Sequence, residues 1–124
     1  MIKGVGVDLI SIERIGRVYQ RHRHRFIKRL FTVQERELII GRASPVAAMA
    51  ARFAAKEAVL KAIGCGIGPA RLAEVEILSS KAGPPEVKLH GQAIREAARR
   101  GISEIKISLT HDPPFACAIA VAYG

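Results

Sequence analysis

Cysteine is scarce in this sequence, where Cys65 and Cys117 are the only two. Cys65 lies between two glycines and Cys117 lies in a late apolar run. Their number and spacing exclude a disulfide framework and a zinc-ligand motif. We therefore expect reduced thiols and a protein of the cytoplasm.

Long apolar runs are also missing. The longest nearly apolar stretch, residues 115–122, is much shorter than the roughly 20 residues that a membrane-spanning helix needs. The first residues show no basic region followed by an apolar block and a small-residue cleavage site. We expect neither a membrane span nor export.

Acidic and aromatic residues are few as well. The 20 Lys and Arg against 11 Asp and Glu give a net charge of +9, which favours an anionic partner such as nucleic acid, lipid or an acidic protein. Four Phe, two Tyr and no Trp offer no platform on which bases would stack, and no recognition-helix motif is present. A nucleic-acid-binding module therefore remains only an alternative, and we expect no nucleic-acid partner.

The sequence predicts one domain, residues 1–124, with the hydrophobic and charged fractions of a globular protein. Strands are predicted at residues 2–10, 72–79, 86–90, 105–110 and 116–123, with a turn at 112–114 joining the last two. Helices are predicted from residue 12, after Thr32 to residue 39, at 44–63 and at 92–100. Helices come early and strands late, which favours an α+β fold with a mainly antiparallel sheet packed on a long central helix.

Local signals mark the ends of two helices. Thr32 followed by Glu35 has the spacing of a capping box. Ser44 and Pro45 are typical of an N-cap and a first helical residue, and Gly64 is typical of a helix end. The segment between them is rich in alanine and predicts the central helix.

Charged residues interrupt this alanine-rich helix at Lys56, Glu57 and Lys61. Glu57 and Lys61 are four residues apart and share one helix face, whereas Lys56 points about 100° away. The spacing alone fits a surface ion pair of Glu57 with Lys61 as well as a functional site.

Asp8 is a second charge among apolar residues, between Val7 and Leu9 in the first predicted strand. An ionised carboxylate is costly to bury unpaired, so Asp8 either lies at an exposed strand end or faces a cation. Two carboxylates, completed by waters and a substrate phosphate, suit Mg²⁺. Asp8 and Glu57 are the candidate pair.

Two other segments have both a structural and a functional interpretation. The glycines Gly64, Gly66 and Gly68 either end the helix or let the backbone approach a ligand closely. They form no dinucleotide fingerprint, because that motif needs a strand before it and a helix after it. His111 precedes a turn, where it is either a ligand contact or a hydrogen-bonded turn residue.

The first predicted helix is amphipathic and basic. Ser11 is its candidate N-cap, and its apolar positions leave Arg14, Arg17 and Arg21 on the exposed side. This face is either simply solvated or a docking surface for an acidic partner.

Three motifs in order resemble the holo-[acyl-carrier-protein] synthases, which are small 4′-phosphopantetheinyl transferases. The motifs are GVGVDL at residues 4–9, RFAAKEA at 52–58 followed by Lys61 and Gly64, and SLTHD at 108–112. Their order across nearly the whole chain makes the resemblance more specific than any single motif.

The resemblance implies the transferase fold and the transfer of 4′-phosphopantetheine from coenzyme A to a serine of acyl carrier protein, in support of fatty acid biosynthesis. It implies Mg²⁺ held by Asp8 and Glu57 at the catalytic centre. Glu57 would help to deprotonate the serine, and Lys61 would stabilise charge on the departing adenosine 3′,5′-bisphosphate. The residues implied to contact the nucleotide part of coenzyme A are Arg52, Lys61, Gly64, Gly66, Gly68 and His111.

The resemblance also implies docking of the acidic carrier on Arg14, Arg17 and Arg21, and a homotrimer with active sites between subunits. Cys65 departs from the usual threonine, Thr110 from the commoner serine, and residues 44–49 are less basic than is typical; these departures concern nucleotide affinity. An Mg²⁺-dependent phosphohydrolase with the same two carboxylates is an alternative, which would release inorganic phosphate and need no acceptor protein.

Overall fold

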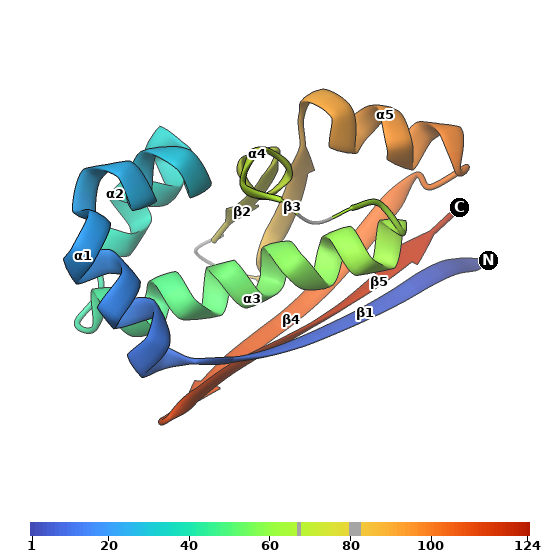
Figure 1. The fold of residues 1–124 in the computed structure, drawn as a ribbon. Coiled ribbons are helices and arrows are strands. Elements are labelled where there is room, and N and C mark those ends of the chain that lie inside the picture. Colours follow the sequence, from blue (N-terminus) through green and yellow to red (C-terminus); the bar gives the residue numbers. More distant parts are fainter. Residues whose placement is uncertain (67, 80–82) are drawn as a thin grey trace.

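The computed structural model describes residues 1–66, 68–79 and 83–124. Its elements, in chain order, are β1 (Ile2–Ser11), α1 (Ile12–Leu30), α2 (Val33–Ile40), α3 (Pro45–Ile63), α4 (Pro69–Ala73), β2 (Val75–Leu78), β3 (Glu86–Leu89), α5 (Gly91–Arg99), β4 (Glu104–Asp112) and β5 (Phe115–Tyr123). Figure 1 shows α3 lying across a sheet formed by β1, β5 and β4.

The three strands are antiparallel in the order β1-β5-β4, and β2 pairs with β3 in a separate antiparallel sheet. The predicted α+β class, with an antiparallel sheet packed on a long helix, is confirmed. Both termini lie at the same end of the sheet, where the Met1 amino group donates to the Gly124 carbonyl at 3.0 Å.

The contact of α3 with β1 and β5 is built from the smallest residues. Side chains alternate along β5, and the alanines at positions 116, 118, 120 and 122 are buried against the helix. On β1, a Cβ atom added to Gly4 or Gly6 would collide with the carbonyl oxygen of Ala62 or Ala58. The helix therefore lies directly on the backbone of β1, which brings its side chains close to those of the strand.

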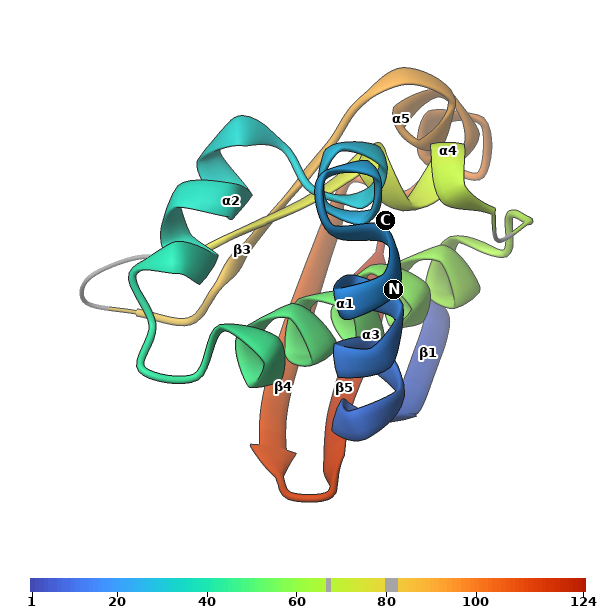
Figure 2. The same cartoon turned by 60° about the vertical axis from the view of Figure 1, so that its left-hand side comes forward.

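The opposite face of this sheet is apolar and uncovered. Both views show the helices on one side of the sheet only (Figures 1 and 2). On the other side, Val5, Val7, Leu9 and Ile119 are exposed by 58%, 57%, 61% and 44%. Val7 stands opposite Ile119 in the strand register, so these residues form one continuous patch, which we call the outer face.

Helix α1 begins at the predicted cap, where the Arg14 amide donates to Ser11 Oγ at 3.2 Å. The helix is kinked at Arg23, which has a φ of 34°. Beyond the kink, Phe26 and Leu30 are buried in the core, and Phe26 packs edge-to-face on Phe31. This apolar anchor leaves the basic side of α1 facing solvent.

Two sequence predictions differ from the structure. The strand predicted from residue 72 begins only at Val75, because Leu72 belongs to the short helix α4; that helix starts at Pro69, and proline favours the first helical turn. Ser44 occupies the N-cap position of α3, but its side chain makes no capping hydrogen bond. The other predicted helices and strands are present within a few residues of their predicted ends. Within the described residues, none of the helices combines the length and apolar character that crossing a bilayer requires.

Candidate active site

Asp8 and Glu57 form a carboxylate pair between β1 and α3. Asp8 stands opposite Ala118 on the inner face of the sheet, so it points toward the helix, and its side chain is only 11% exposed. Asp8 is close enough to Glu57 to act on its pKa through charge and a hydrogen bond. Burial, followed by the charge of Asp8 and this hydrogen bond, raises the pKa of Glu57 to about 7, whereas Lys61 and Arg14 oppose the rise.

Lys61 lies beside this pair. Its Nζ donates to Asp8 Oδ1 at 3.2 Å and to the Val7 carbonyl at 3.0 Å. Lys61 therefore pairs with Asp8, and not with Glu57 as the surface-ion-pair alternative assumed. Lys61 and Glu57 are one helical turn apart and share a face of α3. Because the Lys61 side chain is 43% exposed, its ammonium lies where the carboxylate pair opens to solvent.

The carboxylate pair suits a hard divalent cation. In the part of the chain that the structure describes, no group of three or more His, Cys, Asp or Glu side chains comes together, so the pair offers only two protein ligands. This donor set leaves room for waters and a substrate phosphate, as Mg²⁺ prefers. A cation at this position would also oppose the effects of burial and of the charge of Asp8, which raise the pKa of Glu57.

A basic pocket of about 520 Å³ lies near the other end of α3, with Arg42, Arg52, Ser79 and His111 in its lining. Arg52 is only 4% exposed, and its Nη2 donates to Ser79 Oγ at 2.8 Å. Arg42 donates to the same oxygen at 3.3 Å. Burial and then the charge of Arg42 lower the pKa of Arg52, and Arg52 Nε has no partner among the described atoms. Two converging guanidinium groups favour binding of an anion such as a phosphate.

Arg42 and Ser79 were absent from the sequence-based site. They lie 37 residues apart and meet only through the tertiary structure. Neither stands in a motif, and no local signal in the sequence points to them.

The glycine segment lies apart from this pocket. Gly64 ends α3 with a φ of 85°, and a Cβ there would lie 2.5 Å from Arg100 Nη1. A Cβ at Gly66 or Gly68 would meet nothing within 4 Å, so the backbone there is open to a ligand. The described lining of the pocket includes Arg52 and His111 but none of these glycines. Within one chain, Arg52 and Gly64 are separated by about 18 Å along the helix axis.

Comparison with known proteins decides the family. The family model of the 4′-phosphopantetheinyl transferase superfamily matches residues 4–120. The chain belongs to this superfamily.

Close relatives of this transferase cover its whole length. A holo-[acyl-carrier-protein] synthase of Desulforudis audaxviator is 46% identical over 100% of this chain and 95% of its own. The crystal structure of the synthase from Neisseria meningitidis matches with a TM-score of 0.90 and 32% identity, covering 100% of both chains. The Helicobacter pylori synthase, solved in complex with coenzyme A, matches with a TM-score of 0.81 and 29% identity, covering 96% of this chain and 99% of that one.

The exposed arginines of α1 begin beside the carboxylate pair of the transferase, at Arg14. Arg14, Arg17 and Arg21 are all exposed. Arg14 is close enough to Glu57 for its charge to lower the pKa of that group. Arg17 Nη1 forms an exposed ion pair with Glu13 at 3.2 Å, so part of its charge is already compensated. The basic face thus runs from the carboxylate pair outward along the helix.

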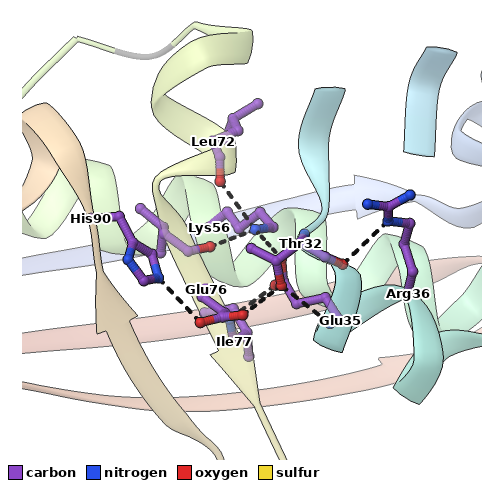
Figure 3. A network of polar contacts seen from close by, with 9 residues as sticks. Thr32, Glu35, Arg36, Lys56, Leu72, Glu76, Ile77 and His90 are labelled. Atoms are coloured by element: carbon purple, nitrogen blue, oxygen red, sulfur yellow. Dashed lines mark hydrogen bonds and ion pairs between the residues drawn. The ribbon is translucent and has the colours of Figure 1, made fainter. Parts of the chain in front are cut away.

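Lys56 is the motif residue whose surroundings the sequence did not reveal. It lies inside the transferase, with 0% of its side chain exposed, in an ion pair with Glu35 at 2.8 Å (Figure 3). The capping box predicted Glu35 at the start of α2, and both of its hydrogen bonds are present. The second role of Glu35, as the partner of Lys56, depends on helix packing and had no sequence signal.

Proposed function

We propose that this chain uses Mg²⁺ to transfer the 4′-phosphopantetheine arm of coenzyme A to the hydroxyl of a serine in an acyl carrier protein. The P–O–P linkage of coenzyme A breaks, a bond forms between the arm's phosphorus and the serine oxygen, and adenosine 3′,5′-bisphosphate leaves. The single observation that carries the proposal is the Asp8–Glu57 carboxylate pair with Lys61 bonded to it, in a member of the superfamily whose full-length relatives are holo-[acyl-carrier-protein] synthases.

Asp8 and Glu57 are the residues that would hold Mg²⁺. When bound, the metal would neutralise charge on the pyrophosphate. Glu57 has a second role as a base, which accepts the serine proton directly or through a water. Its position beside Asp8 and Lys61, at the opening of the carboxylate pair to solvent, lets it receive that proton.

Lys61 stabilises the departing phosphate. Its ammonium is held by Asp8 and the Val7 carbonyl, yet it remains partly exposed and so is accessible to a substrate. A fixed positive charge at this position favours the negative charge that develops on the leaving group.

The nucleotide part of coenzyme A binds, in this proposal, to Arg52 and His111 from one side and to the glycine segment from the other. Arg42 and Ser79 extend the basic pocket. The pocket and the glycine segment lie far apart within a single chain. We therefore propose that the pocket of one subunit and the glycine segment of a second subunit together form each site. The uncovered outer face supports assembly, since an exposed apolar patch favours contact with another copy of the chain. We propose a homotrimer, in which cyclic symmetry closes the assembly.

The exposed arginines of α1 are the proposed docking surface for the acidic carrier. A carrier seated on Arg14, Arg17 and Arg21 would present its serine near Glu57, because Arg14 borders that residue. We propose that the reaction serves fatty acid biosynthesis. Both cysteines are free thiols, which supports a cytoplasmic location.

Mass spectrometry of an apo acyl carrier protein, incubated with the enzyme, coenzyme A and Mg²⁺, tests the proposal. We expect the carrier to gain the mass of one phosphopantetheine arm, and Glu57→Gln to abolish the gain. Release of inorganic phosphate with an unmodified carrier would instead indicate the phosphohydrolase and overturn the transferase proposal.

A further inference from the structure

We propose that the buried Lys56–Glu35 ion pair positions the carboxylate pair: it fixes the rotation of α3 about its axis and thereby sets where Glu57 lies relative to Asp8. Lys56 is then a positioning residue, which acts on the chemistry through its neighbour in the chain. The inference rests on the proposed function, because it assumes that the carboxylate pair is the reactive centre.

Beside the carboxylate pair, the strands β1 and β5 do little to fix the rotation of α3. On β1 and β5 the contact consists of Gly4, Gly6 and the alanines of β5, packed against alanines of α3 such as Ala58. The larger Ile107 and Leu109 of β4 join the same core at the far side of the sheet. Helices and sheets that carry large side chains interlock through ridges and grooves. Glycine and alanine form a close but smooth contact, so on the side of β1 and β5 no interlocking side chains fix the rotation of the helix.

The opposite side of α3 carries a directional anchor. Lys56 Nζ donates to Glu35 Oε1 at 2.8 Å, to the Leu72 carbonyl at 3.0 Å and to the Val75 carbonyl. These acceptors belong to three different elements, α2, α4 and β2, and they use all three protons of the ammonium. Figure 3 shows Lys56 at the centre of this network. A group held from three directions, far from the helix axis, resists rotation of the helix.

Glu35 is itself held firmly. Its Oε1 accepts a further bond from the Thr32 amide at 2.9 Å, and its Oε2 accepts one from the Ile77 amide at 2.9 Å. With both oxygens bonded and no surface exposed, the carboxylate has one available orientation. The anchor for Lys56 therefore does not move with the helix.

Stability alone does not account for this ion pair. Exchange of a buried ion pair for apolar residues of similar volume is often neutral or stabilising, because both ions lose their hydration. A directional constraint on α3 is something that an apolar pair would not supply, and Lys56 directly precedes Glu57 on the same helix.

The required precision is high. A carboxylate about 6 Å from the helix axis moves by roughly 1 Å when the helix turns by about 10°. A misplacement of about 1 Å can cost on the order of 100-fold in rate. A small rotation of α3 is therefore enough to separate Glu57 from Asp8 without unfolding the protein.

The test is the double variant Lys56→Met with Glu35→Gln, which removes both charges, keeps the side-chain volumes and leaves Gln at the capping position. We expect a folded protein with kcat reduced about 10- to 100-fold and KM for coenzyme A changed by less than about threefold, since Arg52 keeps its own bond to Ser79. The second readout needs no substrate: electron paramagnetic resonance should show Mn²⁺ binding weakened about tenfold. The matched control makes the same two exchanges at exposed positions of β3, Lys88→Met with Glu86→Gln, and should match wild type in every readout.

A folded double variant with wild-type kcat and wild-type Mn²⁺ affinity would overturn the inference. If the double variant does not fold, Glu35→Gln alone decides. Lys56 then keeps its two backbone acceptors but loses the charged one, and the glutamine NH2 group cannot accept from the Ile77 amide. We expect a smaller loss of kcat and of Mn²⁺ affinity, and wild-type values would again overturn the inference. Failure of the proposed function gives a different result, because the wild-type enzyme would then leave the carrier unmodified. The comparison of Mn²⁺ binding between wild type and the variants would still test the positioning role.

Discussion

Gly6 of β1 lies so close to the carbonyl oxygen of Ala58 in α3 that no side chain fits between them. Two residues further along the strand, Asp8 meets Glu57, the neighbour of Ala58 in the helix. The absence of a side chain at Gly6 is therefore directly connected to the geometry of the carboxylate pair.

Gly6→Ala should separate β1 from α3. We expect a loss of about 1–3 kcal/mol in the free energy of unfolding, the usual cost of overpacking, and a larger proportional loss in kcat, because Asp8 moves away from Glu57. Thermal unfolding and steady-state kinetics measure the two effects. Gly66→Ala, where the added Cβ meets nothing within 4 Å, is the control for stability and should keep the wild-type Tm. Full activity in Gly6→Ala would contradict this account.

Glu57 should make the stability of the metal-free protein depend on pH. Its pKa is raised from 4.5 to about 7, so between these values the folded state holds a proton that the unfolded state has released. The corresponding stabilisation is complete below pH 4.5 and is lost as the pH rises through about 7.

The measurement is Tm against pH for wild type and Glu57→Gln in the presence of a chelator. We expect the Tm of wild type to fall relative to that of the variant as the pH rises from 4.5 to about 7. Above about pH 7, added Mg²⁺ should reverse this fall. Parallel curves for the two proteins would show that Glu57 has no raised pKa.

Arg14→Glu should weaken productive encounters with the carrier protein. We expect KM for the carrier to rise about fivefold, the equivalent of roughly 1 kcal/mol, and the salt dependence of KM to become weaker. Arg95→Glu, an equal charge change on the exposed side of α5, is the matched control and should keep the wild-type KM. An unchanged KM in Arg14→Glu would show that the carrier docks elsewhere.

Ile119→Lys should disrupt self-association, because it places a charge at the centre of the outer face beside Val7. Sedimentation velocity should show a smaller species than wild type at the same protein concentration, and transfer activity should fall with it. Val33→Lys changes a more exposed apolar residue on α2, away from the outer face, and should sediment like wild type. If Ile119→Lys also sediments like wild type, the outer face is not the subunit interface.

The sequence alone determined the elements that depend on local physical chemistry. Thr32 and Glu35 cap a helix through bonds between near neighbours, and Gly64 ends α3 because glycine readily adopts a positive φ. The motifs were sufficient to predict the family, and the i, i+4 spacing of Glu57 and Lys61 was sufficient to place both on one face of the helix.

Only the tertiary structure decided what each face of α3 meets. The sequence could not tell that Lys61 bonds Asp8, that Lys56 is buried against Glu35, or that Arg42 and Arg52 share Ser79. Each of these contacts joins residues at least 21 positions apart, and its formation depends on how closely and at what angle the layers pack. Helical periodicity determines which side chains point the same way, whereas the glycines and alanines between α3 and the sheet determine how near they come to their partners.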